Sequence, residues 1–164
     1  MNIDEIIQNI AETPGCALLP PRGLPDVAPY RLPADVETFY RRCGGCVLYE
    51  HSDYPFRIVE PERFVQANPV IAGVSGEDDI SYSWYILGRG GSDEHVTIDL
   101  DESRSGRCYD SFWDRHAVAG SSRIIALSMT DLLNRLYANR GNLWYWLQPE
   151  FASLGDAYDS APSI

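Results

Sequence analysis

The chain has 164 residues, of which 45% are hydrophobic, including four Trp, ten Tyr and five Phe. This length suits one domain with a buried core, and so many aromatic residues exclude a disordered chain. The 24 acidic residues outnumber 13 arginines, lysine is absent, and the formal net charge is −11. We therefore expect no binding to nucleic acid or anionic lipid, because both require cations that neutralise phosphates.

The sequence also lacks the signals of export and membrane insertion. No run approaches the roughly 18 apolar residues that a membrane helix needs. The N-terminal stretch "MNIDEIIQNIAE" is acidic and has neither the basic flank nor the small-residue cleavage site of a signal peptide. We therefore expect a cytoplasmic protein that binds no membrane and whose four cysteines are free thiols.

The first predicted element is an amphipathic helix at the N-terminus. Asn2 is a suitable N-cap, and the isoleucines that follow have the spacing of one helix face, at positions Ile3, Ile6, Ile7 and Ile10. Residues 14–32 contain five prolines and two glycines. This composition predicts a linker along the surface, not a regular element.

A second helix is predicted in "RLPADVETFYRRCGG", residues 31–45. Pro33 suits the first helical position, where no N–H is needed, and the early acids and late arginines complement the helix dipole. The buried stripe is predicted to consist of Leu32, Val36, Phe39 and Tyr40. We expect Gly44 to supply the left-handed residue that ends the helix.

The rest of the chain is predicted to be rich in strands. Strands are expected at 46–50, 56–59, 81–88, 95–100, 106–110 and 121–127, with a short helix or turn at 61–69 and a helix at 128–139. Strands bracketed by helices predict a single α+β domain, residues 1–164, with a mostly antiparallel sheet. The small polar tail, 152–164, is expected to fray.

The stretch Cys43-Gly44-Gly45-Cys46 has the spacing of a redox dithiol or of half a zinc site. A reactive dithiol opens a helix, whose N-terminus lowers the thiol pKa, whereas Cys43 is expected to end one, where a thiolate is disfavoured. Zinc would need two more ligands, and the remaining Cys and His residues stand singly. We therefore prefer a structural interpretation, with a redox role as the alternative.

Other patterns suggest chemistry but fail in detail. Asp99, Asp101 and Ser103 alternate as in a calcium loop, but Arg104 stands where that loop needs glycine. The stretch "GRGGSDE", residues 88–94, does not have Lys and Ser/Thr at the positions that a phosphate-binding loop needs. There is no nucleophile elbow and no HExxH motif. The sequence therefore predicts no catalytic, cofactor-binding or metal-ligating residue, and no enzyme.

The stretch "LPADVETFYRRCGGCVL", residues 32–48, resembles the signature of the SUKH superfamily, the Smi/Knr-like family. That signature has Leu-Pro, a short helix with an aromatic residue, and a Gly-Gly turn into a strand. Later segments agree in order: Trp84 within "SWYILGRGGSDEHVTIDL", then "GRCYD" and "IIALSMTDLLNRL". The resemblance covers residues 30–137. Cys43 departs from the family pattern, which commonly has Asn before the glycine pair.

This resemblance implies a curved sheet flanked by helices and no enzymatic activity. Bacterial members are typically immunity proteins, each of which binds and neutralises a cognate toxin, often a nuclease. The fungal Smi/Knr relatives suggest the alternative of a regulatory protein–protein interaction module, and a small thiol or hydrolytic enzyme is a remote third hypothesis. The resemblance carries over no functional residues, and it implies structural roles for Trp84, Gly44 and Gly45.

The charge of the chain fits the immunity hypothesis. A nuclease toxin has a basic groove for its substrate, and an acidic inhibitor would be steered towards it. The candidate partner-binding residues are acids in predicted loops, with one aromatic anchor: Glu77, Asp78, Asp79, Tyr82, Asp93 and Glu94. The alternative explanation is that each acidic cluster is only a solvated turn. A basic toxin is thus the expected partner, and the sequence leaves the oligomeric state open.

Overall fold

A computed structural model, which describes residues 1–159, contains one seven-stranded antiparallel sheet whose strands follow one another in chain order. The predicted single α+β domain with an antiparallel sheet is confirmed. The strands are Ala17–Leu18 (β1), Cys46–Leu48 (β2), Phe56–Ile58 (β3), Trp84–Arg89 (β4), Glu94–Asp99 (β5), Cys108–Phe112 (β6) and Ile124–Ala126 (β7). Three short 3-10 helices, Pro61–Arg63 (η1), Ile80–Ser83 (η2) and Tyr145–Leu147 (η3), lie between or after them.

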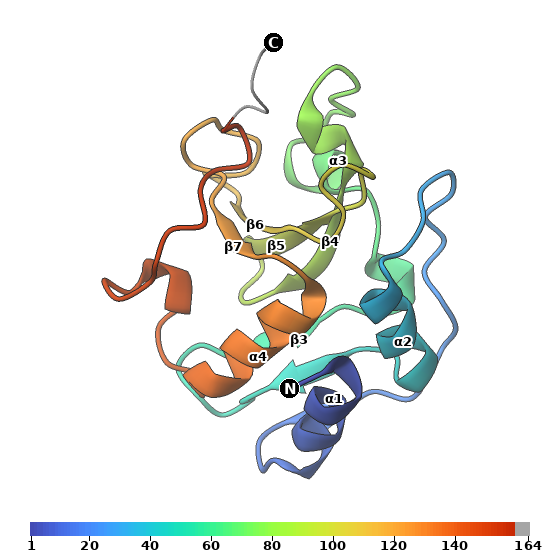
Figure 1. Cartoon of the computed structure of the whole chain (residues 1–164), viewed down its shortest axis with the longest axis vertical. Coiled ribbons are helices and arrows are strands. Elements are labelled where there is room, and N and C mark those ends of the chain that lie inside the picture. Colours follow the sequence, from blue (N-terminus) through green and yellow to red (C-terminus); the bar gives the residue numbers. More distant parts are fainter. Residues whose placement is uncertain (160–164) are drawn as a thin grey trace.

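The α-helices are Ile3–Glu12 (α1), Ala34–Arg42 (α2), Ala67–Ile71 (α3) and Met129–Asn139 (α4). Helices α1, α2 and α4 contact one another and form a group apart from α3 (Figure 1). Asn2 caps α1 as predicted, because its side chain accepts from the Glu5 N–H while the Glu5 carboxylate accepts from the Asn2 N–H. The apolar stripes of these helices join the central strands in one hydrophobic core.

The Pro-rich segment 14–32 contributes the first strand of the sheet, although it was expected to be a linker. Ala17 and Leu18 lie opposite Val47 and Cys46 in β2. A two-residue strand offers no alternation of apolar and polar side chains, so the sequence pattern could not reveal it. The N-terminal helix is thereby tied to the sheet edge.

The Cys-Gly-Gly-Cys stretch is the corner between α2 and β2. Cys43 is the buried C-cap of α2, Cys46 begins β2, and both thiols are free. A Cβ at Gly44 would collide with the carbonyl oxygen of Pro20. Gly45, not Gly44 as expected, has the positive φ, +129°, and a Cβ there would lie 2.7 Å from the Ile58 carbonyl oxygen. Close backbone approach therefore explains both glycines.

The last described residues pack against the sheet. The backbone of Asp156 forms an isolated antiparallel β-bridge with that of Arg123, Ala157 is buried, and the ring of Tyr158 lies 6.0 Å from that of Trp84. These contacts differ from the fraying expected over 152–164, and residues 160–164 lie outside the described part of the chain. Within residues 1–159, no helix combines the length and apolar character needed to cross a bilayer.

Candidate partner interface

The six predicted partner-binding residues form two groups at opposite ends of β4. Glu77, Asp78 and Asp79 lie in the loop before η2, and Tyr82 lies in η2, which leads into β4. Asp93 and Glu94 lie at the hairpin that leaves the other end of β4 and enters β5. A six-residue strand is about 20 Å long, so the two acidic groups do not form one surface.

In the first group, the carboxylate of Asp79 accepts hydrogen bonds from within the protein. Its carboxylate caps η2 by accepting from the N–H and hydroxyl of Ser81, and it accepts from the Tyr158 hydroxyl at 2.6 Å. Burial alone would raise the pKa of Asp79, but these hydrogen bonds outweigh it and hold the pKa below its ordinary value. Glu77 and Asp78 remain exposed and available to a partner.

A buried chain of hydrogen bonds holds this loop in place. The Thr97 and Ser111 hydroxyls are 2.8 Å apart, Ser111 lies 3.0 Å from His116 Nδ1, and His116 Nε2 lies 2.6 Å from Asn68 Oδ1. Asn68 then donates to Ser81 at 3.0 Å. Burial lowers the pKa of His116 to about 4, so the imidazole is neutral at physiological pH.

In the second group, the carboxylate of Glu94 also accepts hydrogen bonds from within the protein. Its carboxylate accepts from the Gly91 N–H and from the indole N–H of Trp144, both at 3.1 Å. A Cβ at Gly90 would lie 2.5 Å from the Trp144 ring, so the indole packs directly on the hairpin backbone. Asp93 stays exposed. The two adjacent acids therefore have different roles: Glu94 stabilises the hairpin through its hydrogen bonds, and Asp93 is exposed to solvent.

The hairpin borders a surface groove of about 620 Å³. We call it the Trp113 groove and define it by the residues Tyr54, Asp93, Trp113, Asp114, Leu143 and Trp144. Trp113 is 70% exposed, the most of any large hydrophobic residue in the described chain. Its backbone N–H donates to the Asp93 carbonyl oxygen at 3.1 Å, which fixes it beside the hairpin.

The floor of the Trp113 groove is a rigid aromatic cluster. The Trp144 and Trp146 rings stack with centroids 5.5 Å apart, and Phe112 and Tyr54 meet Trp144 edge to face. Aromatic clusters of this kind are stiff, because their rings interlock and few rotamers are open to them. A partner would therefore meet a preformed surface.

The rim of the Trp113 groove is acidic. Asp93 and Asp114 are exposed, whereas the nearby Arg115 donates to the buried carboxylate of Asp110 at 2.7 Å. The positive charge of Arg115 is thus paired with a carboxylate of the same protein. The groove combines an exposed indole with free carboxylates, which suits a basic partner with an apolar contact point.

Two further buried carboxylates, Asp99 and Asp110, have structural partners. Asp99 accepts from Ser83, Arg104 and Tyr109, and Asp110 accepts from Arg115 and the Trp146 indole. Burial raises the pKa of the Cys43 and Cys46 thiols, as expected for packed side chains. Within residues 1–159, no three His, Cys, Asp or Glu side chains form a metal-binding group.

Comparison with known proteins then decides the family. Residues 27–135 match the SMI1 / KNR4 family (SUKH-1). The chain belongs to this family. The resemblance stated from the sequence is therefore confirmed, and the match includes Asp93, Trp113 and Asp114 but ends before Trp144.

A curated relative spans nearly the whole chain. It is "Immunity protein YokJ" from Bacillus subtilis (strain 168), which is 51% identical over 160 residues, or 97% of each chain. No solved structure matches. The relative's printed name agrees with the immunity-protein type predicted from the sequence.

Sequence reasoning missed the aromatic part of the candidate interface. Trp113, Tyr54 and Leu143 come from three separate segments, and nothing in those segments distinguishes an exposed aromatic residue from a core one. The only local signal was the acidic neighbour of Trp113, Asp114. Tyr82, the anchor expected from the sequence, is partly exposed but lies at the other end of β4.

Proposed function

We propose that this SMI1/KNR4-family protein is a non-catalytic immunity protein that binds and neutralises a basic protein toxin in the cytoplasm. The 51% identical relative named as an immunity protein supports the function. The exposed Trp113 between the acidic residues Asp93 and Asp114 supports the Trp113 groove as the surface that meets the toxin. That exposed indole is the single structural observation that carries the proposal.

An exposed tryptophan costs solubility unless a partner covers it, and tryptophan is among the residues that dominate binding energy at interfaces. Here the side chain stands on a rigid floor, so little conformational entropy is lost when a partner packs against it. The surrounding carboxylates would steer a cationic toxin to the groove and compete with its acidic ligand or nucleic-acid substrate. A toxin that acts as a nuclease fits this mechanism.

The experiment is a binding titration against the toxin encoded beside this protein, at low and high salt. We expect one-to-one binding with nanomolar affinity that weakens as salt screens the carboxylates. Trp113→Ala should weaken binding by about thirtyfold or more, which corresponds to about 2 kcal/mol. Leu127→Ala removes another exposed apolar side chain remote in sequence from the groove, and it is the matched control.

The outcomes separate the two parts of the proposal. Absence of binding at micromolar concentrations would contradict the immunity function and favour a regulatory interaction module. Tight binding that Trp113→Ala leaves unchanged would retain the function and contradict the groove as its site.

A further inference from the structure

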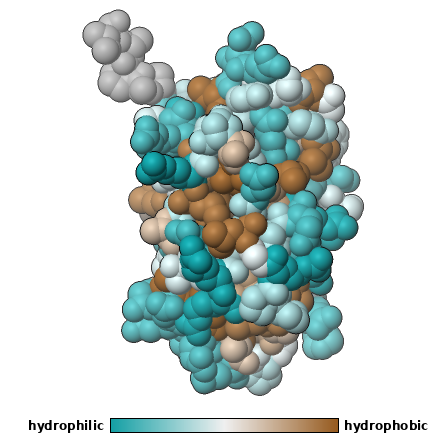
Figure 2. Space-filling view, turned by 90° about the vertical axis from the view of Figure 1, so that its right-hand side faces the viewer, coloured by the Kyte–Doolittle hydropathy of each residue, from teal (hydrophilic) through white to brown (hydrophobic). Residues whose placement is uncertain are grey.

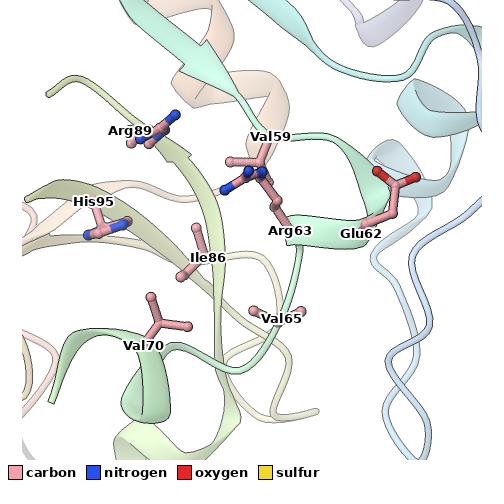
Figure 3. Close-up of a pocket in the computed structure, with 8 residues that line it drawn as sticks. All are labelled: Val59, Glu62, Arg63, Val65, Val70, Ile86, Arg89 and His95. Carbon is pink, nitrogen blue, oxygen red and sulfur yellow. The ribbon is translucent and has the colours of Figure 1, made fainter. Parts of the chain in front are cut away.

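On the other side of the β4–β5 hairpin lies a small pocket with the opposite charge. It has a volume of about 190 Å³. Its apolar wall comes from Val65, Val70 and Ile86, and its polar edge from Arg63, Arg89 and His95. Figure 3 shows these side chains arranged around a common space, with Glu62 set apart from Arg89 and His95.

The strand register creates this positive charge. Arg57 in β3 lies opposite Arg89 in β4, and Arg89 lies opposite His95 in β5. Like charges directly opposite each other, such as Arg57 and Arg89, destabilise a sheet, and such local conflicts are typical of functional sites. The conflict stands out in a chain whose net charge is −11.

Of the two arginines that line the pocket, Arg63 has an acidic partner within the protein and Arg89 has none among the described residues. Glu60 pairs with Arg57 at 3.2 Å and with Arg63 at 3.8 Å, and Glu62 pairs with Arg22 at 3.0 Å. Within residues 1–159, the Arg89 guanidinium has no acidic group in ion-pair distance. One pocket wall therefore carries an uncompensated guanidinium.

His95 adds a second unused polar group. Its Nδ1 is buried and has no hydrogen-bond partner among the described residues. A buried nitrogen left without a partner is costly. Burial lowers the pKa of His95, the positive charge of Arg89 lowers it further, and Asp93 acts in the opposite sense. A bound anion would offset the positive charge of Arg89 beside this ring.

We propose that this pocket binds a small aliphatic carboxylate, with the carboxylate at Arg89 and His95 and the aliphatic part against Val65, Val70 and Ile86. The volume is below the roughly 300–1,000 Å³ of sites for drug-sized ligands, so the occupant has the size of one side chain or of a short free acid. Guanidinium groups bind carboxylates with two parallel hydrogen bonds. This site is separate from the Trp113 groove, and its binding of a carboxylate does not rest on the proposed function, which enters only when the natural source of the carboxylate is identified. Figure 2 shows the face on the α2 side of the molecule, where apolar residues form a patch within a mainly hydrophilic surface.

The test is a titration of the full chain with hexanoate, followed by NMR of the His95 ring and of the Val65, Val70 and Ile86 methyl groups. Hexylamine and hexanol are the matched probes of opposite and zero charge. We expect saturable shifts with hexanoate at millimolar concentrations and none with the other two probes. Arg89→Gln should abolish the shifts, whereas Arg107→Gln, which removes a charge outside the pocket, should retain them.

A second variant, Val70→Phe, guards against a folding artefact because it changes an exposed position on α3. The larger side chain should narrow the pocket and weaken the binding of hexanoate. The same titration on the toxin complex identifies the natural source of the carboxylate. Competition with the toxin indicates a carboxylate of the partner, and independent binding indicates a free acid. The proposal is overturned if hexanoate gives no saturable shift up to about 20 mM, or if hexylamine and hexanol give the same shifts.

Discussion

His116 Nε2 and Asn68 Oδ1 lie 2.6 Å apart, although the two residues are separated by 48 positions in the chain. The Asn68 amide nitrogen already donates to the Ser75 carbonyl oxygen and the Ser81 hydroxyl, so its oxygen must accept from the imidazole. His116 therefore carries its proton on Nε2 and accepts at Nδ1 from the Ser111 hydroxyl. Protonation of the imidazole would reverse the bond at Nδ1, because a charged ring donates at both nitrogens and the Ser111 hydroxyl would have to accept.

Stability should therefore depend on pH through His116. Its pKa is about 4 in the folded protein and about 6.5 in the unfolded chain. The unfolded chain takes up the proton first, so the stabilisation is complete above pH ~6.5 and falls as pH drops towards ~4. The loss should approach about 3 kcal/mol, measured by denaturant unfolding across this range.

The control for this prediction is the comparison of two histidine variants. His116→Gln should be less stable at neutral pH and should lose most of the slope between these pH values. His51→Gln, at an exposed position, should retain the slope. An unchanged slope in His116→Gln would show that another group carries the pH dependence.

The two acidic groups should differ in their effect on toxin association. The double variant Asp93→Asn/Asp114→Asn removes two charges from the rim of the Trp113 groove and should slow association several-fold and flatten its salt dependence. Glu77→Gln/Asp78→Asn removes the same charge at the other end of β4 and should have a smaller effect. Stopped-flow association at several salt concentrations measures both. A larger effect of the second variant would move the interface to the loop before η2.

The two glycines of the corner between α2 and β2 should be required because a side chain would not fit there, and not only because glycine has a flexible backbone. Gly44→Ala should cost about 1–3 kcal/mol of unfolding free energy, because the new Cβ meets the Pro20 carbonyl oxygen. Gly23 has a φ of +87° but open space around it, so Gly23→Ala isolates the conformational cost of about 1 kcal/mol. Equal stability of Gly44→Ala and the parent protein would show that the backbone shifts freely there.

The cysteines of that corner should be unreactive in the folded protein. Cys46 is fully buried and Cys43 almost so, whereas Cys16 is partly exposed. In a timed reaction with a thiol reagent, Cys16 should react first, and Cys43 and Cys46 should react at the rate of unfolding. The Cys16→Ser variant is the control, because its remaining thiols should all be slow. Rapid formation of a Cys43–Cys46 disulfide under mild oxidation would instead support a redox role.

Several elements could be predicted from the sequence because their determinants are local. The spacing of the isoleucines predicted α1 and the Asn2 cap supplied its start. Three members of the predicted α2 stripe, Val36, Phe39 and Tyr40, are fully buried. The fourth, Leu32, is only partly buried and precedes the helix, whose N-cap is Pro33. Strands β4 and β5 and helix α4 also lie within one to three residues of their predicted positions.

The sequence by itself thus indicated the family, through the order of the motifs that resemble it, and it also indicated the α+β class and the negative charge. The class and the charge follow from local periodicity, capping and composition. Only the tertiary structure decided which acids are free. It committed Asp79 and Glu94 to hydrogen bonds within the chain and left Asp93 exposed beside Trp113. The physical reason is that exposure and pairing depend on residues distant in sequence, such as Tyr158 and Trp144, which only the folded chain brings near.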